Sequence, residues 1–225
     1  MCPEAPMTTT RTTDLRDRDS AAPAKTRPRR HDTNREPVVI PAAGETAHDP
    51  VPFPTMQIAL VVGNPKAASR TSRVAQAVGA AVAAGLPGDT ATEVIELAEI
   101  GGRLFDWGDA EATALSATVA AADVVVVACP TYKATYTGLL KAFLDRYGSN
   151  GLAGVTAVAV MVGAAPIHAL APETYLRPLL VELGASVPSR ALYVLESQLD
   201  DLAAVVDAWA ATAVPLITAV AGRNG

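Results

Sequence analysis

The sequence contains little cysteine and little histidine, and it shows no cluster of metal-binding side chains. Its 225 residues include two cysteines, Cys2 and Cys129, which lie far apart in the chain. Two such thiols make neither a disulfide framework nor a structural zinc site. The sequence therefore predicts the reduced thiols of a cytoplasmic protein, and it predicts no bound metal.

The chain also lacks the basic charge of nucleic-acid binders and the long apolar runs of membrane spans. Residues 1–55 hold eight basic and eight acidic side chains, so residues 56–225 carry the whole net charge of −5. A nucleic-acid binder usually has a basic face instead. Half of the residues are hydrophobic, but no run reaches the roughly 18 uncharged apolar residues of a spanning helix. We expect neither nucleic acid nor a membrane as a partner.

Residues 1–55 differ in composition from the rest of the chain. Thr, Arg, Asp and Pro dominate this segment, and its apolar residues show no periodicity. Such a segment buries too little apolar surface to offset its conformational entropy. The twin arginines Arg29 and Arg30 run into His31 rather than into an apolar stretch, which argues against a secretory signal. The sequence predicts a disordered tail over 1–55 and one domain over 56–225.

From residue 56 onward, short apolar runs alternate with stretches of helical periodicity. The expected strands are Gln57–Val62, Glu93–Leu97, Val124–Ala128, Thr156–Val162 and Ala191–Leu195. The expected helices are 71–85, Ala110–Ala121, Thr137–Tyr147, Thr174–Leu183 and Leu202–Val220. Alternating strands and helices form a parallel sheet that is covered on both faces. The prediction is a three-layer α/β/α sandwich.

Two doubly wound strand orders fit this alternation. The dinucleotide-binding order normally uses six strands, whereas the flavodoxin-like order 2-1-3-4-5 uses five and places its crevice between strands one and three. Five expected strands favour the flavodoxin-like fold. Periodicity alone leaves both orders open, so the loops at the carboxyl ends of the strands must distinguish them.

The loop after the first expected strand, residues 63–72, brings hydroxyl groups to the start of a helix. Ser69, Thr71 and Ser72 stand there, next to the unpaired N–H groups and the positive dipole of the helix N-terminus. This combination suits a terminal phosphate. The loop is neither a Walker loop nor a Gly-x-Gly-x-x-Gly turn. The alternative is that Ser69 or Thr71 only caps the helix.

Two further loops are expected at the same crevice. Residues 129–138, after the third strand, supply Tyr132, Tyr136 and the rigid Pro130, which offer a flat surface to a planar ring. Residues 163–168, after the fourth strand, begin with Gly163, which allows a ligand edge close to the backbone. The three loops together predict a phosphate-binding loop, an aromatic surface for a planar ring, and a glycine that lets the ligand approach the backbone.

The second loop and the helix after it carry a specific sequence motif. The run Pro130-Thr131-Tyr132-Lys133, followed by residues 136–145, resembles the signature of NAD(P)H-dependent FMN reductases. The resemblance covers residues 57–195 and is closest to the reductases of two-component alkanesulfonate-type monooxygenase systems. The related quinone and azo reductases usually carry Pro-Glu-Tyr-Asn at this place.

The resemblance implies FMN as the flavin and NADPH or NADH as the hydride donor. It implies that the FMN phosphate binds at Ser69, Thr71 and Ser72, and that the isoalloxazine ring lies against Pro130, Thr131, Tyr132, Lys133 and Ala134, with Gly163 nearby. Arg70 and Lys133 are the basic residues nearest the crevice, and the alternatives for them are a phosphate of the nicotinamide nucleotide or a solvated surface charge. It also implies a partner monooxygenase and a homodimer or homotetramer. The subunit contact is expected on a stripe formed by Tyr136, Leu139, Leu140 and Phe143.

Hydride transfer to a flavin needs no catalytic side chain, because the cofactors carry the chemistry. His168 is the single histidine in residues 56–225, and Cys129 follows an apolar run typical of a packed thiol. We therefore expect no catalytic residue. Two other readings stay open: a quinone, azo or metal-ion reductase on the same fold, and a non-catalytic flavin-binding or redox-sensing module. Fold alone does not separate them.

Overall fold

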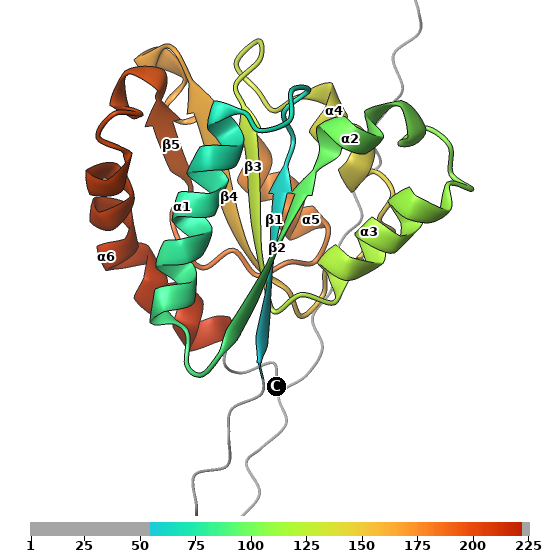
Figure 1. The fold of residues 1–225 in the computed structure, drawn as a ribbon, viewed down its shortest axis with the longest axis horizontal. Helices are drawn as coiled ribbons and strands as arrows, with labels where there is room; N and C mark the ends of the chain where they lie inside the picture. Colours follow the sequence, from blue (N-terminus) through green and yellow to red (C-terminus); the bar gives the residue numbers. More distant parts are fainter. Residues whose placement is uncertain (1–54, 222–225) are drawn as a thin grey trace, which may run out of the picture. The chain divides into compact units, whose positions relative to one another are not determined.

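All five expected strands are present in the computed structural model, which describes residues 55–221 (Figure 1). They are β1 (Met56–Val62), β2 (Thr90–Glu96), β3 (Val124–Pro130), β4 (Thr156–Gly163) and β5 (Leu192–Leu195). Every neighbouring pair is parallel, and the order is β2-β1-β3-β4-β5. This confirms the flavodoxin-like order. The tail expected over 1–55 lies outside the described residues, apart from Thr55.

Helices cover both faces of the sheet, which confirms the three-layer arrangement (Figure 1). One face is covered by α1 (Arg70–Gly85) and α6 (Leu202–Ala221). The other face is covered by α2 (Leu97–Ile100), α3 (Ala110–Ala120), α4 (Gly138–Leu144) and α5 (Arg177–Glu182). Shorter helical turns lie at Gly101–Arg103, Pro166–His168, Pro172–Leu176 and Glu196–Gln198.

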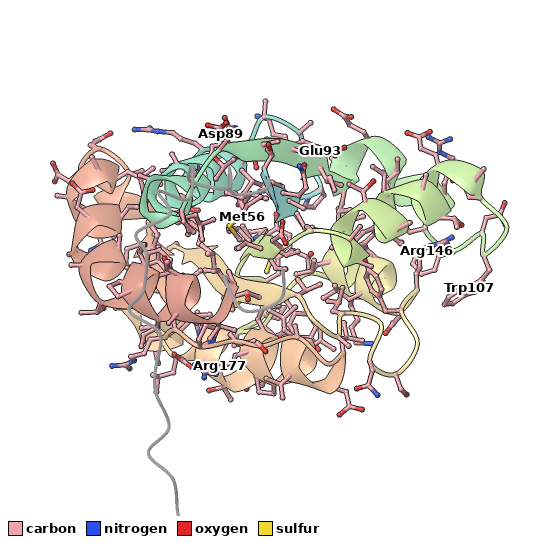
Figure 2. The ribbon with its side chains drawn as sticks, turned by 90° about the horizontal axis from the view of Figure 1, so that it is seen from below. Met56, Asp89, Glu93, Trp107, Arg146 and Arg177 are labelled. Atoms are coloured by element: carbon pink, nitrogen blue, oxygen red, sulfur yellow. The ribbon has the colours of Figure 1, made fainter. Side chains whose placement is uncertain are left out.

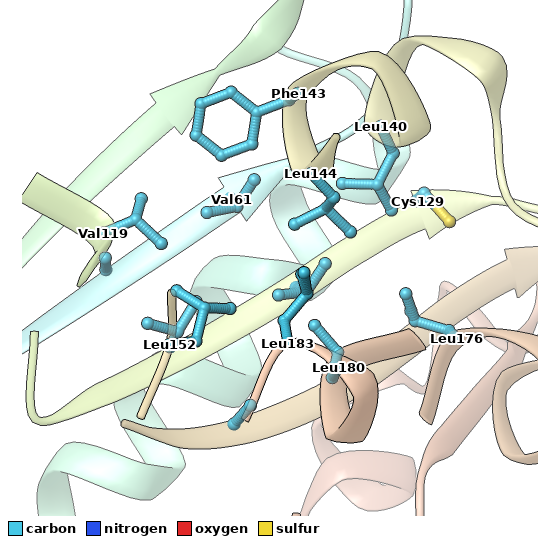
Figure 3. Close-up of a cluster of buried hydrophobic side chains, with 14 of the residues drawn as sticks. Val61, Val119, Cys129, Leu140, Phe143, Leu144, Leu152, Leu176, Leu180 and Leu183 are labelled. Carbon is cyan, nitrogen blue, oxygen red and sulfur yellow. The ribbon is translucent and has the colours of Figure 1, made fainter. Parts of the chain in front are cut away.

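The side chains of each strand alternate between two hydrophobic clusters. On β1, Ile58 and Leu60 point toward α1 and α6, whereas Ala59 and Val61 point toward the helices of the opposite face. Figure 3 shows the cluster on this opposite face, in which Val61 lies near Phe143 and Leu144 of α4. A strand that is buried on both faces has to be apolar at every position. This explains why β3 begins with four consecutive valines.

Most element boundaries lie within two residues of the expected ones, and three differ by three residues, each for a local reason. The edge strand β2 begins at Thr90 rather than Glu93. Its first residues are exposed and not uniformly apolar, so the sequence pattern did not include them. Helix α4 ends at Leu144 rather than Tyr147, because the N–H groups of residues 146 and 147 bond three residues back and tighten the last turn. The helix expected at Thr174–Leu183 begins instead with a π-helical turn at Pro172–Leu176.

The π-helical turn and two short helices were not expected. Pro178 has no N–H to donate to the carbonyl of Thr174, and the regular α-helix α5 therefore begins only at Arg177. Between β2 and β3, the four-residue helix α2 and the turn Gly101–Arg103 precede α3. Elements this short leave no periodic pattern in a sequence.

An arginine fastens the connection between Gly101–Arg103 and α3. Arg146, which follows α4, donates to the carbonyls of Leu104 and Asp106 at 3.1 and 2.9 Å. Its guanidinium carbon also lies 5.6 Å from the centre of the Trp107 ring, a cation–π contact (Figure 2). The exposed Trp107 is thereby held in one place although little of it is buried.

Within the described residues, α6 is the one helix that is long and apolar enough to cross a membrane by length and composition. In this structure it packs against the sheet and α1, and Leu202, Val206 and Ile217 enter the hydrophobic cluster on that face. Asp207 interrupts its apolar sequence. The expected absence of a membrane partner stays a prediction.

Candidate functional site

The loop after β1 and the loop after β3 meet at the carboxyl edge of the sheet. Between them lies a hollow of about 310 Å³, whose lining consists of Asn64, Lys66, Ala68, Ser69, Arg70 and Tyr132. β1 and β3 are adjacent, but the helices that follow them cover opposite faces of the sheet. This divergence opens the crevice. Ser69 and Tyr132, which are 63 positions apart in the chain, thus line the same hollow.

The hydroxyl oxygens of the first loop accept hydrogen bonds from the protein, and their O–H groups remain available as donors. Ser69 caps α1, and its Oγ accepts from the backbone N–H of Ser72 at 3.2 Å. Thr71 accepts from the side-chain amide of Asn64, and Ser72 from that of Gln76. Within residues 55–221, none of these three O–H groups donates to a protein acceptor. Each can therefore donate to a ligand oxygen.

The three hydroxyls differ in their access to the hollow. Ser69 lines it, whereas Thr71 and Ser72 are buried and are not part of its lining. Asn64 shapes the loop, because its side-chain oxygen accepts from the N–H of Lys66 at 2.9 Å while its amide holds Thr71. Gly63-Asn64-Pro65 predicts a turn after the first strand, and in the structure the side chain of Asn64 closes it.

Two cations stand at the rim of the hollow. Lys66 and Arg70 both line it, and the N-terminus of α1 adds partial positive charge. Arg70 is not free, because its Nη1 lies 2.9 Å from Oε2 of Glu196, at the carboxyl end of β5. No local sequence pattern predicts this ion pair, because its members are 126 residues apart. The electrostatics of the hollow favour an anion.

The second loop folds into a tight turn that carries Tyr132. Tyr132 and Thr135 exchange two backbone hydrogen bonds of 2.9 and 3.2 Å. The two residues between them, Lys133 and Ala134, have φ values of 51° and 67°. This is the geometry of a type I′ turn, which normally takes Asn and Gly. Tyr132 is 51% exposed beside the hollow, and Lys133 and Ala134 form the tip of the turn.

An Ala134→Gly variant should unfold at a higher temperature than the wild-type protein. Alanine in the left-handed region costs about 1 kcal/mol or more, and glycine removes this cost although it loosens the unfolded chain. We expect a net gain of about 0.5 kcal/mol, measured by thermal unfolding. Ala169→Gly is the matched control, because the φ of Ala169 is −57° and the change should destabilise. A lower melting temperature for Ala134→Gly would contradict the strain.

A buried threonine ties the two loops together. Thr137 Oγ1 donates to the carbonyl of Gly63 at 2.7 Å and accepts from the N–H of Leu140 at 3.1 Å. The N–H of Gly63 in turn donates to the carbonyl of Ala128 at 2.7 Å. A Cβ at position 63 would lie 2.7 Å from Cβ of Leu140. Gly63 therefore allows α4 to start directly against the first loop.

The third loop places Gly163 beside the end of β3. A Cβ on Gly163 would lie 2.1 Å from Oη of Tyr193 and 3.1 Å from Oγ1 of Thr131. Tyr193 fills this space and donates to the carbonyl of Ala165 at 2.8 Å. The glycine is therefore required by Tyr193 whether or not a ligand binds. Thr131 Oγ1 is buried and has no hydrogen-bond partner among the described residues.

The thiol of Cys129 is packed rather than reactive. It is fully buried, and burial raises its pKa to about 12, against a smaller lowering by the backbone N–H of Thr137. The thiol is therefore neutral at physiological pH. In the described part of the chain, no group of His, Cys, Asp and Glu is arranged to hold a metal ion.

These residues fit a phosphorylated planar ligand such as FMN. The hollow combines two cations and a hydroxyl with the exposed Tyr132, and the unpaired Thr131 hydroxyl lies next to Gly163. The structure thus brings Ser69, Arg70 and Tyr132 together around one space. Pro130 ends β3 directly before them.

Comparison with known proteins identifies the family. The model of the NADPH-dependent FMN reductase family matches residues 56–200. The FMN reductase (NADPH) of Pseudomonas aeruginosa is 31% identical over 150 residues, which are 64% of this chain and 80% of the relative. The NADH-dependent FMN reductase SfnF of Pseudomonas putida is 29% identical over 143 residues, which are 61% of this chain and 76% of the relative.

A solved structure agrees. The apo form of the NADH:FMN oxidoreductase EMOB superimposes with a TM-score of 0.60 at 30% sequence identity, over 70% of this chain and 89% of that chain. The resemblance noted in the second loop is confirmed. The chain belongs to the NADPH-dependent FMN reductase family, as an oxidoreductase that uses FMN and a nicotinamide nucleotide.

Proposed function

We propose that this chain reduces FMN with a hydride from NADPH or NADH and then releases the reduced flavin. The observation that carries the proposal is the hollow that joins a hydroxyl-rich helix start, two cations and an exposed tyrosine. The first two features suit a phosphate, and the third suits a flat ring. When bound, FMN supplies the redox chemistry by accepting the hydride from the nicotinamide.

In this proposal, the first loop holds the phosphate. The free O–H groups of Ser69, Thr71 and Ser72 donate to phosphate oxygens, together with the unpaired N–H groups in the first turn of α1. Arg70 adds positive charge, for this phosphate or for that of the nicotinamide nucleotide. These contacts bind and orient the flavin, and none of them transfers a proton.

The second and third loops hold the ring in the same proposal. The isoalloxazine lies against Pro130–Ala134, where Tyr132 covers its apolar surface and Lys133 stands at the edge. Gly163 lies nearby, and the unpaired hydroxyl of Thr131 bonds to the polar edge of the ring. Hydride transfer to the flavin requires no acid or base from the protein, so we assign no catalytic residue.

The decisive experiment is to purify the protein, record its visible spectrum and follow NAD(P)H oxidation with and without added FMN. We expect oxidation that depends on FMN. A rate with a quinone far above the rate with FMN would assign the chain to the quinone reductases. Oxidation no faster than background would leave a flavin-binding or redox-sensing module.

We also propose a cytoplasmic homodimer or homotetramer that passes reduced FMN to a separate monooxygenase. The resemblance to alkanesulfonate-type reductases supports the partner, and exposed apolar side chains such as Ile167, Leu170 and Val181 support self-association. The stripe expected to join subunits on α4 is partly used inside the subunit, because Leu140 and Phe143 are fully buried. Sedimentation at the 23.1 kDa mass of one chain would contradict the oligomer.

A Tyr132→Ala variant should bind FMN several-fold more weakly and turn over more slowly. Removal of the ring contact costs roughly 0.5–1.5 kcal/mol beyond simple burial, and a loosely held flavin meets the nicotinamide less often at transfer distance. Flavin fluorescence and steady-state rates measure both effects. Tyr175→Ala is the matched control, because Tyr175 is similarly exposed, at 47%, and does not line the hollow. Unchanged FMN affinity in Tyr132→Ala would remove Tyr132 from the ring site.

A further inference from the structure

One of the two cations at the hollow, Arg70, forms an ion pair with an acidic side chain. Glu196 Oε2 lies 2.9 Å from Nη1 of Arg70, with side-chain exposures of 37% for Glu196 and 63% for Arg70. Lys66, the other cation of the lining, forms no ion pair within residues 55–221. The positive charge offered to a phosphate is therefore smaller than the lining residues alone suggest.

The position of Glu196 is set by the turn that carries it. The side chain of Gln198 accepts from the N–H of Leu195 at 2.9 Å, and the N–H of Leu199 donates back to the carbonyl of Glu196. The carbonyl of Leu199 accepts from Nη2 of Arg73, on α1, at 3.0 Å. Because Arg73 fastens the turn to α1, the carboxylate of Glu196 stays near the N-terminus of that helix.

The ion pair of Arg70 and Glu196 exerts opposing electrostatic forces on a phosphate at the N-terminus of α1. Arg70 attracts it, while the carboxylate of Glu196 repels it and competes for the same guanidinium. An exposed ion pair is worth at most about 1 kcal/mol, so a phosphate can take Arg70 from Glu196. The repulsion needs no contact and persists while the phosphate is bound.

We propose that Glu196 is a specificity-determining residue that lowers the affinity of the hollow for phosphorylated flavin. The proposal rests on the proposed function. It explains how a protein whose phosphate site has two cations and several hydroxyl groups can still release its flavin. The paired Arg70 weakens retention of the phosphate, whereas the ring contacts at Tyr132 are unaffected. Glu196 therefore acts on FMN and not on riboflavin, which lacks the phosphate.

The test compares the affinities of FMN and riboflavin, by fluorescence titration, in the wild-type protein, Glu196→Gln and Asp200→Asn. Asp200 is an exposed acid four residues further on, without a contact to Arg70, so its variant matches the change in charge. We expect Glu196→Gln to bind FMN about two- to fivefold more tightly, with riboflavin unchanged. Asp200→Asn should leave both affinities unchanged. The gain should shrink in high salt.

Two results would overturn the role of Glu196. FMN affinity that is unchanged or weaker in Glu196→Gln means that the acid does not oppose the phosphate, and a weaker affinity means that it organises Arg70 instead. An equal gain for riboflavin and FMN means that the effect does not act through the phosphate. Failure of the proposed function is distinguishable, because in that case the wild-type protein binds neither flavin.

Discussion

A Gly63→Ala variant should lose most of its flavin affinity and unfold at a markedly lower temperature. The added Cβ lies 2.7 Å from Cβ of Leu140 and 3.3 Å from Cβ of Cys129, and Cβ atoms cannot rotate away. The start of α4 must therefore shift, and the buried bond from Thr137 to the carbonyl of Gly63 weakens. Overpacking of this kind costs about 1–3 kcal/mol, and the buried hydrogen bond adds about 1 kcal/mol.

Thermal unfolding and fluorescence titration with FMN measure the two effects of Gly63→Ala. Gly138→Ala is the matched control, because Gly138 begins the same helix and an added Cβ meets no atom within 4 Å there. That variant should keep both its stability and its affinity. If Gly63→Ala binds FMN as tightly as the wild-type protein, the two loops need not be held together for binding.

The double variant Ser69→Ala, Thr71→Ala should bind FMN at least tenfold more weakly. A hydrogen bond from a hydroxyl to a charged phosphate is typically worth about 1.5–3 kcal/mol, and about 1.4 kcal/mol corresponds to tenfold in affinity. Because Ser69 also caps α1, the variant should lose about 1 kcal/mol of stability as well. Fluorescence titration gives the affinity, and thermal unfolding gives the stability.

Two controls separate phosphate binding from helix capping in this variant. Riboflavin, which has no phosphate, should bind the double variant and the wild-type protein equally. Asp109→Ala removes the cap of α3, where Oδ1 accepts from the N–H of Ala112 at 2.8 Å, and should reduce stability without changing FMN affinity. FMN affinity that survives in the double variant would return Ser69 and Thr71 to a purely structural role.

The sheet was predictable from the sequence because its central strands are buried on both faces. Runs such as Val124–Val127 are typical of strands that place alternate side chains in two hydrophobic clusters. The strand β2 was predicted less well, since it lies at an edge and its residues Ala91–Val94 are exposed. Its true start depends on backbone pairing with β1, which begins at the pair Met56 and Thr90.

The candidate site was predictable only where a residue's own type carries the signal. Ser69 and Tyr132 are recognisable as a hydroxyl at a helix start and an aromatic residue after a strand. The contacts that arrange them join residues far apart in the chain, 74 positions for Thr137 with Gly63 and 126 for Arg70 with Glu196. Single-sequence patterns report local periodicity and composition, so such pairs become visible only in the fold.

The turn at Lys133 and Ala134 was hidden for a different reason. Residues in the left-handed conformation of such a turn are normally Asn or Gly, but here they are Lys133 and Ala134. The turn is closed instead by the paired backbone groups of Tyr132 and Thr135. A conformation that the surrounding structure imposes leaves no mark in the local sequence.

The hydrogen bond between Thr137 and Gly63 constrains how the second loop can be exchanged between relatives. A chimaera that receives residues 130–136 from a quinone reductase keeps this bond and should position its new turn correctly. A longer graft that replaces Thr137 with a residue lacking a hydroxyl leaves the carbonyl of Gly63 without its side-chain donor. A graft meant to change the preferred electron acceptor should therefore end before residue 137. A graft that includes α4 should also keep glycine at position 63.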